Sequence, residues 1–460
     1  MICIVHINFI NIWKGKKMKQ NLNLESGKIS KLFFSFAVPS TISMIVTSLY
    51  TIADGVFITR GVGSDGIAAV NIGYPIINFT VALSLMFGIG GATLIAFKKD
   101  DIKYQNKCFS HIILLNIFVY IIVASMIFLF TKPLMMAMGA NEKLLPMIKG
   151  YMYPCTVSTF FLMISMSLNA VVRNDNAPRR AMVSTLLGAG LNIILDYLFI
   201  FKFNLGIEGG AYATAISQII SAVYLCRHFI GSTFKLDLSL KKIDFFLLKK
   251  LLSIGFPSFV LEFAVAVITV LLNIAFMNAV GVFGASAYGI ISYSFMFFRM
   301  LFTGLSQGIQ PIVSFNYGRK NLDRVKKMLI FAHKVTFGTS IVSLIIIFFL
   351  ATPVVRIFTH DAPLVVESAK GFILYSIALS FLGFNFVNIA YLQAVDRPMV
   401  SNVICMSRSF LFVFIGLIFL PKLIGVNGIW LALPFADFIT AILTIPFMKK
   451  ITVNYVKASV

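Results

Sequence analysis

The stretch LNIILDYLFIF, from Leu191 to Phe201, places an aspartate in the middle of a run that otherwise suits hydrocarbon. A charged residue at the centre of a bilayer costs about 2.5 to 3.5 kcal/mol on insertion scales, so it generally faces the protein interior and serves a function. The whole chain has the composition of a polytopic membrane protein, because 59% of its 460 residues are hydrophobic and only 12% are charged. Asp196 is therefore the first candidate for a functional residue.

Apolar runs of membrane-spanning length follow one another along the chain. A helix needs about 20 residues to cross a bilayer. The sequence contains twelve such runs, near 33–57, 67–96, 109–131, 149–171, 181–201, 209–231, 250–276, 286–315, 330–351, 371–393, 402–421 and 428–448. It shows no series of segments with the alternating polarity of transmembrane β-strands. The sequence therefore predicts an all-α membrane protein with twelve transmembrane helices.

Basic residues orient the predicted helices. With the N-terminus inside, 28 of the 39 Lys and Arg fall in cytoplasmic segments and eight fall on the other side. By the positive-inside rule, both termini lie in the cytoplasm. These short basic loops account for the formal net charge of +22, so the charge does not indicate a nucleic-acid partner. Residues 1–17 lack the small-residue cleavage site of a signal peptide, and Met18 is an alternative start.

Cysteine and histidine residues form no recognisable site. The cysteines lack CxxC or metal-ligand spacing, which predicts free thiols at Cys3, Cys108, Cys155, Cys226 and Cys405. The five histidines are dispersed and make no metal or catalytic constellation. The chain has no GxxxxGK[ST] pattern, so we expect an ion gradient to drive any transport in place of ATP. Neither an enzyme nor a bound cofactor is predicted.

The chain also repeats itself. A shift of 218 residues without a gap pairs several residues of the two halves, among them Ser35 with Ser253, Pro39 with Pro257, Gly63 with Gly281, and Gly90 with Gly308. Later in each half the shift drifts by one or two residues, and it then pairs Pro178 with Pro398 and Gly206 with Gly425. Two six-helix lobes follow, related by a pseudo-two-fold axis along the membrane normal and enclosing a central cavity.

The repeat divides the chain into five parts. We expect a cytoplasmic N-terminal segment at 1–32, an N-terminal lobe at 33–231, a cytoplasmic linker at 232–249, a C-terminal lobe at 250–448 and a cytoplasmic tail at 449–460. Two lobes around a cavity are typical of alternating access, whereas a rigid scaffold such as a channel is the alternative. Pro39 and Pro257 favour movement, because each removes a backbone hydrogen bond inside the first helix of its lobe. Pro39 is the candidate hinge.

Polar residues inside the N-terminal lobe suggest a cation site. Asn192 and Asp196 are four residues apart, so their side chains project from one helix face, and Thr214 and Gln218 repeat that spacing on the next helix. Together with Asp54 on the first helix, they offer the oxygen atoms that a monovalent cation or a proton site requires. The alternative for Asp54 is that it caps its helix near Arg60 and pairs with that residue.

Three stretches resemble one transporter family. PSTISMIVTSLYTIADGVFI at 39–58, LNIILDYLFIF with LGIEGGAYATAISQ at 191–218, and GLSQGIQPIVSFNYG at 304–318 occur in the order typical of the multidrug and toxic compound extrusion (MATE) family. The similarity runs from about residue 35 to 448 and is greatest to the bacterial DinF/MepA-like branch. In that branch the resemblance implies a cation site at Asp54, Asn192, Asp196 and Thr214.

The C-terminal lobe departs from another branch of the same family. That branch binds the cation through a glutamate on its seventh helix and an aspartate on its tenth, but here the tenth helix carries Asn385 and Asn388 and no acid. Glu262 follows Pro257 closely, and we expect it to pair with Arg299. Contact with substrate is the alternative role for Glu262. Substrate contact is likewise the alternative role for Gln218, for Arg299 and for Asp437 in the last helix.

The resemblance implies a secondary antiporter of the bacterial inner membrane, which exports small organic, often cationic compounds in exchange for Na⁺ or H⁺. Many Met and aromatic residues suit varied apolar cations. A monomer is expected, with the lipid bilayer and the transported compound as its partners. The alternative is a flippase for a lipid-linked precursor, which would need a markedly basic cavity. An ion channel would need a filter loop, and the sequence contains no repeated one.

Overall fold

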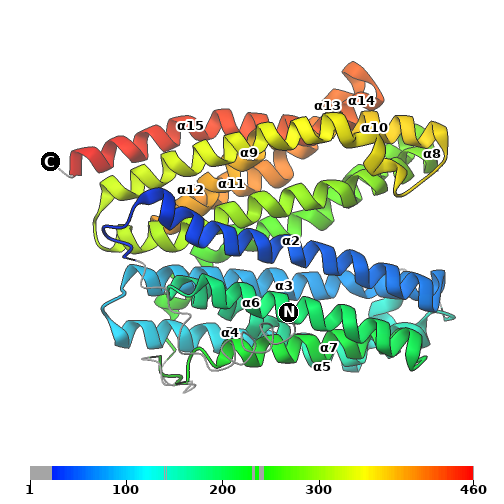
Figure 1. Cartoon of the computed structure of the whole chain (residues 1–460), viewed down its shortest axis with the longest axis horizontal. Helices are drawn as coiled ribbons and strands as arrows, with labels where there is room; N and C mark the ends of the chain where they lie inside the picture. Colours follow the sequence, from blue (N-terminus) through cyan, green and yellow to red (C-terminus); the bar gives the residue numbers. More distant parts are fainter. Residues whose placement is uncertain (1–22, 139, 141, 231–233, 238–242, 459–460) are drawn as a thin grey trace, which may run out of the picture.

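The computed structural model describes residues 23–458, except 139, 141, 231–233 and 238–242. Within these residues the chain is helical and contains no strand (Figure 1). The N-terminal half comprises α2 (Ile29–Val62), α3 (Ser64–Phe97), α4 (Ile102–Ala137), α5 (Leu145–Asn174), α6 (Pro178–Asp196), the π-helix η1 (Tyr197–Lys202) and α7 (Gly206–Cys226). The C-terminal half comprises α8 (Phe245–Gly318), α9 (Leu322–Arg356), α10 (Ala362–Ser376), α11 (Leu379–Ala394), α12 (Pro398–Met406), the π-helix η3 (Ser407–Leu411), α13 (Phe412–Ile424), α14 (Val426–Trp430) and α15 (Ala432–Ala458).

Helix α8 accounts for two membrane crossings. Its 74 residues would rise about 110 Å if they were straight, far more than the hydrocarbon core of about 30 Å. Gly281, with φ 68° and ψ −153°, breaks the helix and lets its two arms fold back on each other. Helices α10 and α11 make a single span with a bend of 42° between them. Counted in this way, with α15 as the last span, the described residues contain the twelve predicted crossings.

Several predicted helix ends are wrong. The third helix was expected at 109–131 but runs from Ile102 to Ala137, and the sixth was expected to reach 231 but ends at Cys226. The tenth, expected as one helix at 371–393, is broken between α10 and α11. The third helix is longer than predicted because hydropathy follows only the apolar part of a helix, whereas the hydrogen-bonded backbone continues through the headgroup region into water. The sixth helix is shorter because residues 227–230, although partly apolar, form turns. For the same reason as the third helix, α15 continues into the predicted tail, as far as Ala458.

Helices α2 and α8 each begin a few residues before the lobes expected from the sequence. Helix α2 begins at Ile29, inside the segment expected to precede the first lobe, and residues 1–22 lie outside the described part. Helix α8 begins at Phe245, within the predicted linker, and the carboxylate of Asp244 caps it by accepting from the backbone N–H groups of Phe246 and Leu247. The linker residues 231–233 and 238–242 also lie outside the described part.

The backbone repeats the duplication that the sequence predicts. Gly63 joins α2 to α3 at φ 96°, and its repeat partner Gly281 joins the arms of α8 at φ 68°. A residue with a Cβ is strained at such angles, whereas glycine adopts them freely. Gly206 and Gly425 form a second such pair, at φ 58° and 60°. Both halves therefore turn in the same way at the same points, as two copies of one helical unit.

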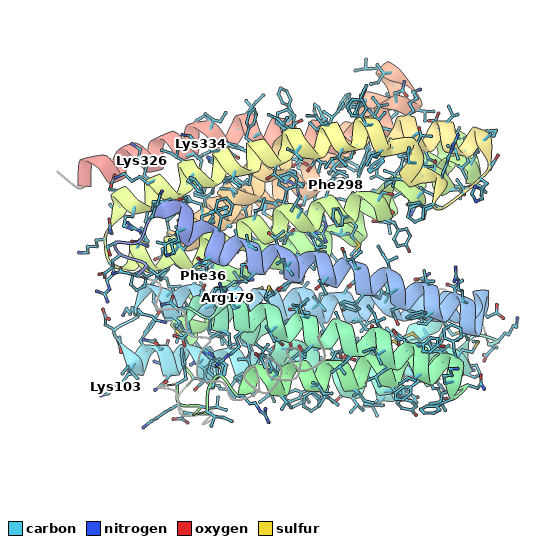
Figure 2. The ribbon with its side chains drawn as sticks, viewed as in Figure 1. Phe36, Lys103, Arg179, Phe298, Lys326 and Lys334 are labelled. Atoms are coloured by element: carbon cyan, nitrogen blue, oxygen red, sulfur yellow. The ribbon has the colours of Figure 1, made fainter. Side chains whose placement is uncertain are left out.

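The two lobes meet at one end of the molecule, which we call the basic end because Lys103, Arg179 and Lys326 lie there (Figure 2). There a Cβ added to Gly255 would lie 1.9 Å from the carbonyl oxygen of Met86, and one added to Gly308 would lie 2.5 Å from the Cα of Ala37. Helices of opposite lobes thus touch backbone to backbone. From this contact the ribbons of the two lobes diverge toward the other end (Figure 1).

Candidate functional site

The predicted polar residues of the N-terminal lobe lie on three helices that pack together. Asp54 is on α2, Asn192 and Asp196 are on α6, and Thr214 is on α7. Asn192 and Asp196 are buried, and Asp54 is half-buried. At Asp196 the α-helix ends and the π-helix η1 begins. Such π-turns occur frequently at functional sites.

Direct contacts connect these side chains. The Asn192 Nδ2 donates to the Thr214 Oγ1 at 3.3 Å, which links α6 to α7. The carboxyl groups of Asp54 and Asp196 lie close enough to interact with each other across α2 and α6. Arg60 makes no ion pair with Asp54 within the described residues, so the alternative that Asp54 pairs with Arg60 has no support. The structure therefore brings together the four residues expected to form the cation site.

Five oxygen atoms of this cluster lack hydrogen-bond donors. Asp54 Oδ1, Asn192 Oδ1, both carboxylate oxygens of Asp196 and Gln218 Oε1 are all buried without a partner among the described residues. A buried acceptor without a donor costs about 1 to 3 kcal/mol. A cation or a proton would satisfy several of these acceptors at once, and Na⁺ in transporters is held by oxygen atoms of this kind. The residues thus fit either coupling ion.

The cluster contains too few strong ligands for a transition metal. Across the described residues, no group of three or more His, Cys, Asp or Glu side chains is arranged so that it could hold a metal ion. The described cysteines are free thiols at Cys108, Cys155, Cys226 and Cys405, as predicted, and Cys3 lies outside the described part. Two carboxylates with neutral oxygen ligands suit a weakly bound, exchangeable ion better than a permanently held one.

A tyrosine connects this cluster to the other lobe. Tyr74, on α3, lies within electrostatic range of Asp54 and Tyr50 in its own lobe and of Glu262 and Tyr293 on α8. The exposed fraction of its side chain is 39%, so part of the ring is open to a bound molecule. The surfaces that face each other between the lobes therefore carry both aromatic rings and acids.

Glu262 lies where the sequence predicts, and its expected partner is confirmed. The Arg299 Nη2 lies 3.8 Å from the Glu262 Oε2, with both residues on α8. The separation is long for an ion pair, and the Glu262 side chain is 26% exposed. Its carboxylate is therefore only loosely held and remains accessible.

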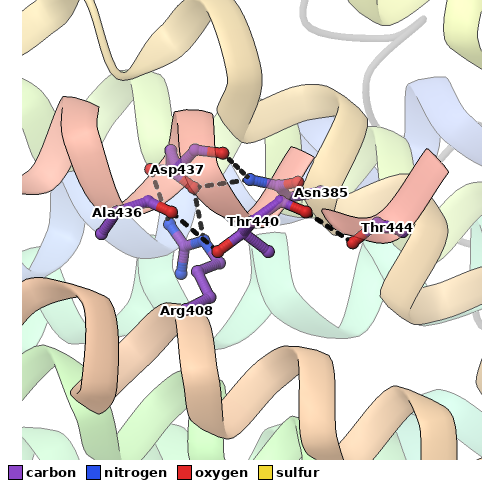
Figure 3. A network of polar contacts seen from close by, with 6 residues as sticks. All are labelled: Asn385, Arg408, Ala436, Asp437, Thr440 and Thr444. Carbon is purple, nitrogen blue, oxygen red and sulfur yellow. Dashed lines mark hydrogen bonds and ion pairs between the residues drawn. The ribbon is translucent and has the colours of Figure 1, made fainter. Parts of the chain in front are cut away.

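Asp437 is held much more tightly, in a buried network of the C-terminal lobe (Figure 3). The Arg408 Nε and Nη2 donate to its two carboxylate oxygens at 2.5 and 3.1 Å. The Asn385 Nδ2 donates to its Oδ1 at 2.9 Å. Asp437 is fully buried and Arg408 is 5% exposed. Both acceptor oxygens are satisfied within the protein, and contact of Asp437 with substrate stays a prediction.

Sequence reasoning missed the partner of Asp437. Arg408 lies on the π-helix η3 and Asp437 on α15, 29 residues apart along the chain. A signal was available, because two opposite charges stand in consecutive apolar runs and an unpaired charge in each would be costly.

Comparison with known proteins fits the geometry of the two lobes. The MatE family model matches residues 39–198 and again residues 257–418, and the starts of these matches are offset like Pro39 and Pro257 in the repeat. The chain belongs to the MatE family. This confirms the predicted resemblance, and because MATE proteins are transporters, the chain is a membrane transporter and not an enzyme.

Relatives of this MatE transporter cover nearly its full length. The multidrug export protein MepA of Staphylococcus saprophyticus is 26% identical over 421 residues, which are 90% of this chain and 91% of that protein. MepA of Staphylococcus aureus strain MSSA476 is 26% identical over 434 residues, which are 93% of this chain and 95% of that protein.

Solved structures share the fold of this MatE transporter. An outward-facing multidrug resistance MATE family transporter of the MOP superfamily aligns with a TM-score of 0.87 at 21% identity, covering 96% of this chain and all of that one. A MATE structure in a bent conformation aligns with a TM-score of 0.88 at the same identity and coverage. The two-lobed, twelve-helix architecture is thereby confirmed.

In this MatE transporter the candidate hinge, Pro39, lies at the contact between the lobes. It is buried in α2, between Ala37, which faces Gly308, and Thr41, which faces Gly304. The Ser43 hydroxyl donates to the Pro39 carbonyl at 2.9 Å. The proline thus stands where α2 leaves the interlobe contact, and the backbone there has one hydrogen bond fewer than the rest of the helix. Its role as a hinge stays a prediction.

Proposed function

We propose that this MatE transporter exports small organic, often cationic compounds across the bacterial inner membrane in exchange for Na⁺ or H⁺. The observation that carries the proposal is the set of buried oxygen acceptors around Asp54 and Asp196, none of which has a donor in the described part of the chain. A site that lacks positive charge in the protein itself is suited to a cation that enters and leaves in each cycle. The relatives named multidrug export protein MepA support export as the direction of transport and drugs of varied structure as the substrates.

The surface between the lobes supports an organic cation as substrate. Phe79 of the N-terminal lobe contacts Phe259 and Phe263 of the other lobe, with ring centroids 5.8 and 6.2 Å apart. Beyond these rings lie Tyr74 and the accessible carboxylate of Glu262. Aromatic faces attract cations, and a loosely paired carboxylate supplies a counter-charge that needs no fixed geometry. Compounds of different shape but the same charge can therefore be held.

The two fluxes would be coupled through the charge of Asp54 and Asp196, which the coupling ion neutralises when it binds. Two carboxylates as close as Asp54 and Asp196 resist joint ionisation unless a cation is present. Binding of Na⁺ or H⁺ thus favours one arrangement of α2, α6 and α7, and the loss of that ion favours another. Asp54 also lies within electrostatic range of Tyr74, which faces the space between the lobes. Neutralising the Asp54 carboxylate therefore weakens the attraction of a cationic substrate to that space. This difference in affinity between the two states couples the two fluxes.

Alternating access requires the contact at the basic end to open. The Arg173 Nη1 donates to the Gln307 Oε1 at 2.7 Å across the lobes, and Arg319 pairs with Asp100 at 2.8 Å. By the positive-inside rule this end faces the cytoplasm, with both termini on that side. The state described is then closed to the cytoplasm, with the lobes diverging on the outside. Because both lobes belong to one chain, a monomer is sufficient for the cycle.

Transport by inverted membrane vesicles tests the proposal. We expect vesicles that contain the wild-type protein to accumulate ethidium when a Na⁺ gradient or, separately, a pH gradient is imposed, and Asp196→Asn to abolish the response. Asp65→Asn is the matched control, because Asp65 belongs to the same lobe but has an exposed side chain that pairs with Lys143. The proposal fails if neither gradient drives accumulation of the dye, or if Asp65→Asn has the same effect as Asp196→Asn.

A further inference from the structure

A second site lies in the C-terminal lobe, apart from the surface between the lobes. Helices α9 and α15 make few contacts with each other, and both pack on α11, which forms the floor between them. The resulting groove has a volume of about 470 Å³. That volume falls within the usual range of binding sites for small molecules. Its walls are mostly apolar and aromatic, and they include Phe337, Phe381, Phe438 and Ile442.

The groove opens on the outer face of the lobe. Helix α15 packs against helices of its own lobe, and the side chains of Phe337 and Ile442 are 66% and 46% exposed. The lining residues extend from 333 to 340 on α9 and from 438 to 445 on α15. Seven helical residues rise about 10 Å, and the groove begins about 16 Å along α9 from its start at the basic end. A bilayer would present acyl chains to this face.

One charge stands in the wall of the groove. Lys334 is exposed, and no carboxylate among the described residues lies within ion-pair distance of it. The neighbouring His333 is occupied, because its Nε2 contacts the Asn388 Oδ1 at 3.1 Å and its ring stacks on Phe384 at 4.7 Å. Figure 2 shows Lys334 on the same helix as Lys326, nearer to the middle of the bundle. A cation at this depth gains from an anion held beside it.

We propose that this groove binds an anionic glycerophospholipid of the leaflet at the basic end, with one acyl chain between α9 and α15 and the phosphate at Lys334. The apolar walls suit the chain, and the lone ammonium group complements the headgroup. A cationic transport substrate does not fit here, because Lys334 repels it. The lipid fills the space between the two helices and braces the lobe that moves as a body during transport.

Photo-crosslinking in detergent tests this site on the full-length protein. The probe is phosphatidylglycerol with a diazirine in one acyl chain, and its zwitterionic control is phosphatidylcholine with the same chain. We expect phosphatidylglycerol to label the peptides that contain 333–341 and 438–445 about five times more than phosphatidylcholine, since one lysine contributes about 1 kcal/mol to the attraction of an anionic lipid.

Three variants locate the charge and the chain. Lys334→Gln should remove the preference for phosphatidylglycerol, so that both probes label equally. Ser380→Phe, which fills the inner end of the groove, should reduce labelling by both. Lys326→Gln is the matched control, because Lys326 is an exposed lysine about two turns earlier on α9 and outside the groove, and it should label like the wild type. Each variant is first checked for monodisperse elution and an unchanged unfolding midpoint. If Ser380→Phe does not fold, the result for Lys334→Gln alone tests the lipid site.

Three results would overturn the proposal. The first is equal labelling of these peptides by both probes in the wild type. The second is a loss of preference in Lys326→Gln as large as in Lys334→Gln. The third is protection of the groove by ethidium, which would assign it to the transported compound. None of these results depends on the cation cluster of the N-terminal lobe.

Discussion

The two lobes share a backbone but differ in how their buried charges are balanced. The drifted shift of 219 residues that pairs Gly206 with Gly425 also pairs Gln218 with Asp437. In the N-terminal lobe Gln218 Oε1 lacks a donor, as do the oxygens of Asp196. In the C-terminal lobe both carboxylate oxygens of Asp437 accept from Arg408. The N-terminal lobe thus buries acidic oxygens without a donor among the described residues, whereas the C-terminal lobe pairs its buried carboxylate with its own cation.

This difference supports the proposed ion-binding role of the N-terminal cluster and a structural role of the C-terminal pair. A buried ion pair adds little net stability, but the loss of one partner leaves a charge that nothing compensates. The guanidinium of Arg408 also lies 5.0 Å from the ring of Phe386, which fixes it further. A coupling ion must be able to leave, and Arg408 cannot. We therefore expect mutations in the two clusters to affect different properties of the protein.

The largest effect is expected from breaking the C-terminal pair. Asp437→Asn leaves the Arg408 charge buried without its counter-charge, which should lower the free energy of unfolding by about 3 to 5 kcal/mol. Replacing both residues together, Arg408→Met with Asp437→Leu, should recover most of that loss. Thermal unfolding in detergent measures both. If the single variant is as stable as the wild type, the contrast between the lobes does not hold.

Removing a carboxylate from the N-terminal cluster should act on transport and spare stability. Asp54→Asn and Asp196→Asn keep the shape and remove the charge, and each lost charged ligand should reduce gradient-driven ethidium export about tenfold or more. Folding should be unaffected, because the replaced oxygens accept no hydrogen bond from the protein. Glu262→Gln is the comparison in the other lobe and should be milder. Wild-type export by both aspartate variants, together with an inactive Glu262→Gln, would place coupling in the C-terminal lobe.

The two repeat-related prolines sharpen the comparison further. Pro39→Ala restores a backbone hydrogen bond in α2 at the interlobe contact, so we expect normal insertion but a several-fold fall in export. Pro257→Ala makes the same change in α8, in the lobe whose buried Asp437 is already paired with Arg408, and should have the smaller effect. Dye efflux at matched expression compares the two. Equal export by Pro39→Ala and the wild type would mean that bending at Pro39 is not part of the cycle.

The smallest effect is expected for the neutral ligands. Asn192→Ala and Thr214→Ala each remove one member of the hydrogen bond between α6 and α7. Such a bond contributes about 1 kcal/mol, so the ion concentration needed for half-maximal export should rise about fivefold, with the maximal rate nearly kept. Export measured against a series of Na⁺ concentrations and a series of pH values identifies the ion. If neither variant changes the Na⁺ concentration or the pH at which export is half-maximal, Asn192 and Thr214 do not belong to the site.

The sequence was sufficient to predict two kinds of feature: contacts set by residue spacing along one helix, and membrane spans set by the length of an apolar run. Asn192 and Asp196, four residues apart, are both buried in one cluster, and Glu262 meets Arg299. It could not predict the pairing of Arg408 with Asp437, because that contact depends on how two separate helices are rotated. The π-helix at Ser407–Leu411 changes the direction of Arg408 relative to an α-helix, and no residue pattern in the sequence marks it. The break between α10 and α11 was missed for the same reason.

The position of Pro39 along α2 has a mechanical consequence. Ten residues separate it from the start of the helix at Ile29, and 23 separate it from the end at Val62. At 1.5 Å per residue, the two arms are about 15 and 35 Å long. A tilt about the proline would therefore move the outer end roughly twice as far as the inner end. Only Gly63 separates α2 from α3, so the outer arm would pull α3 with it. If α2 bends at Pro39 as predicted, it would act as an unequal lever, in which a small separation at the basic end becomes a wide movement at the other.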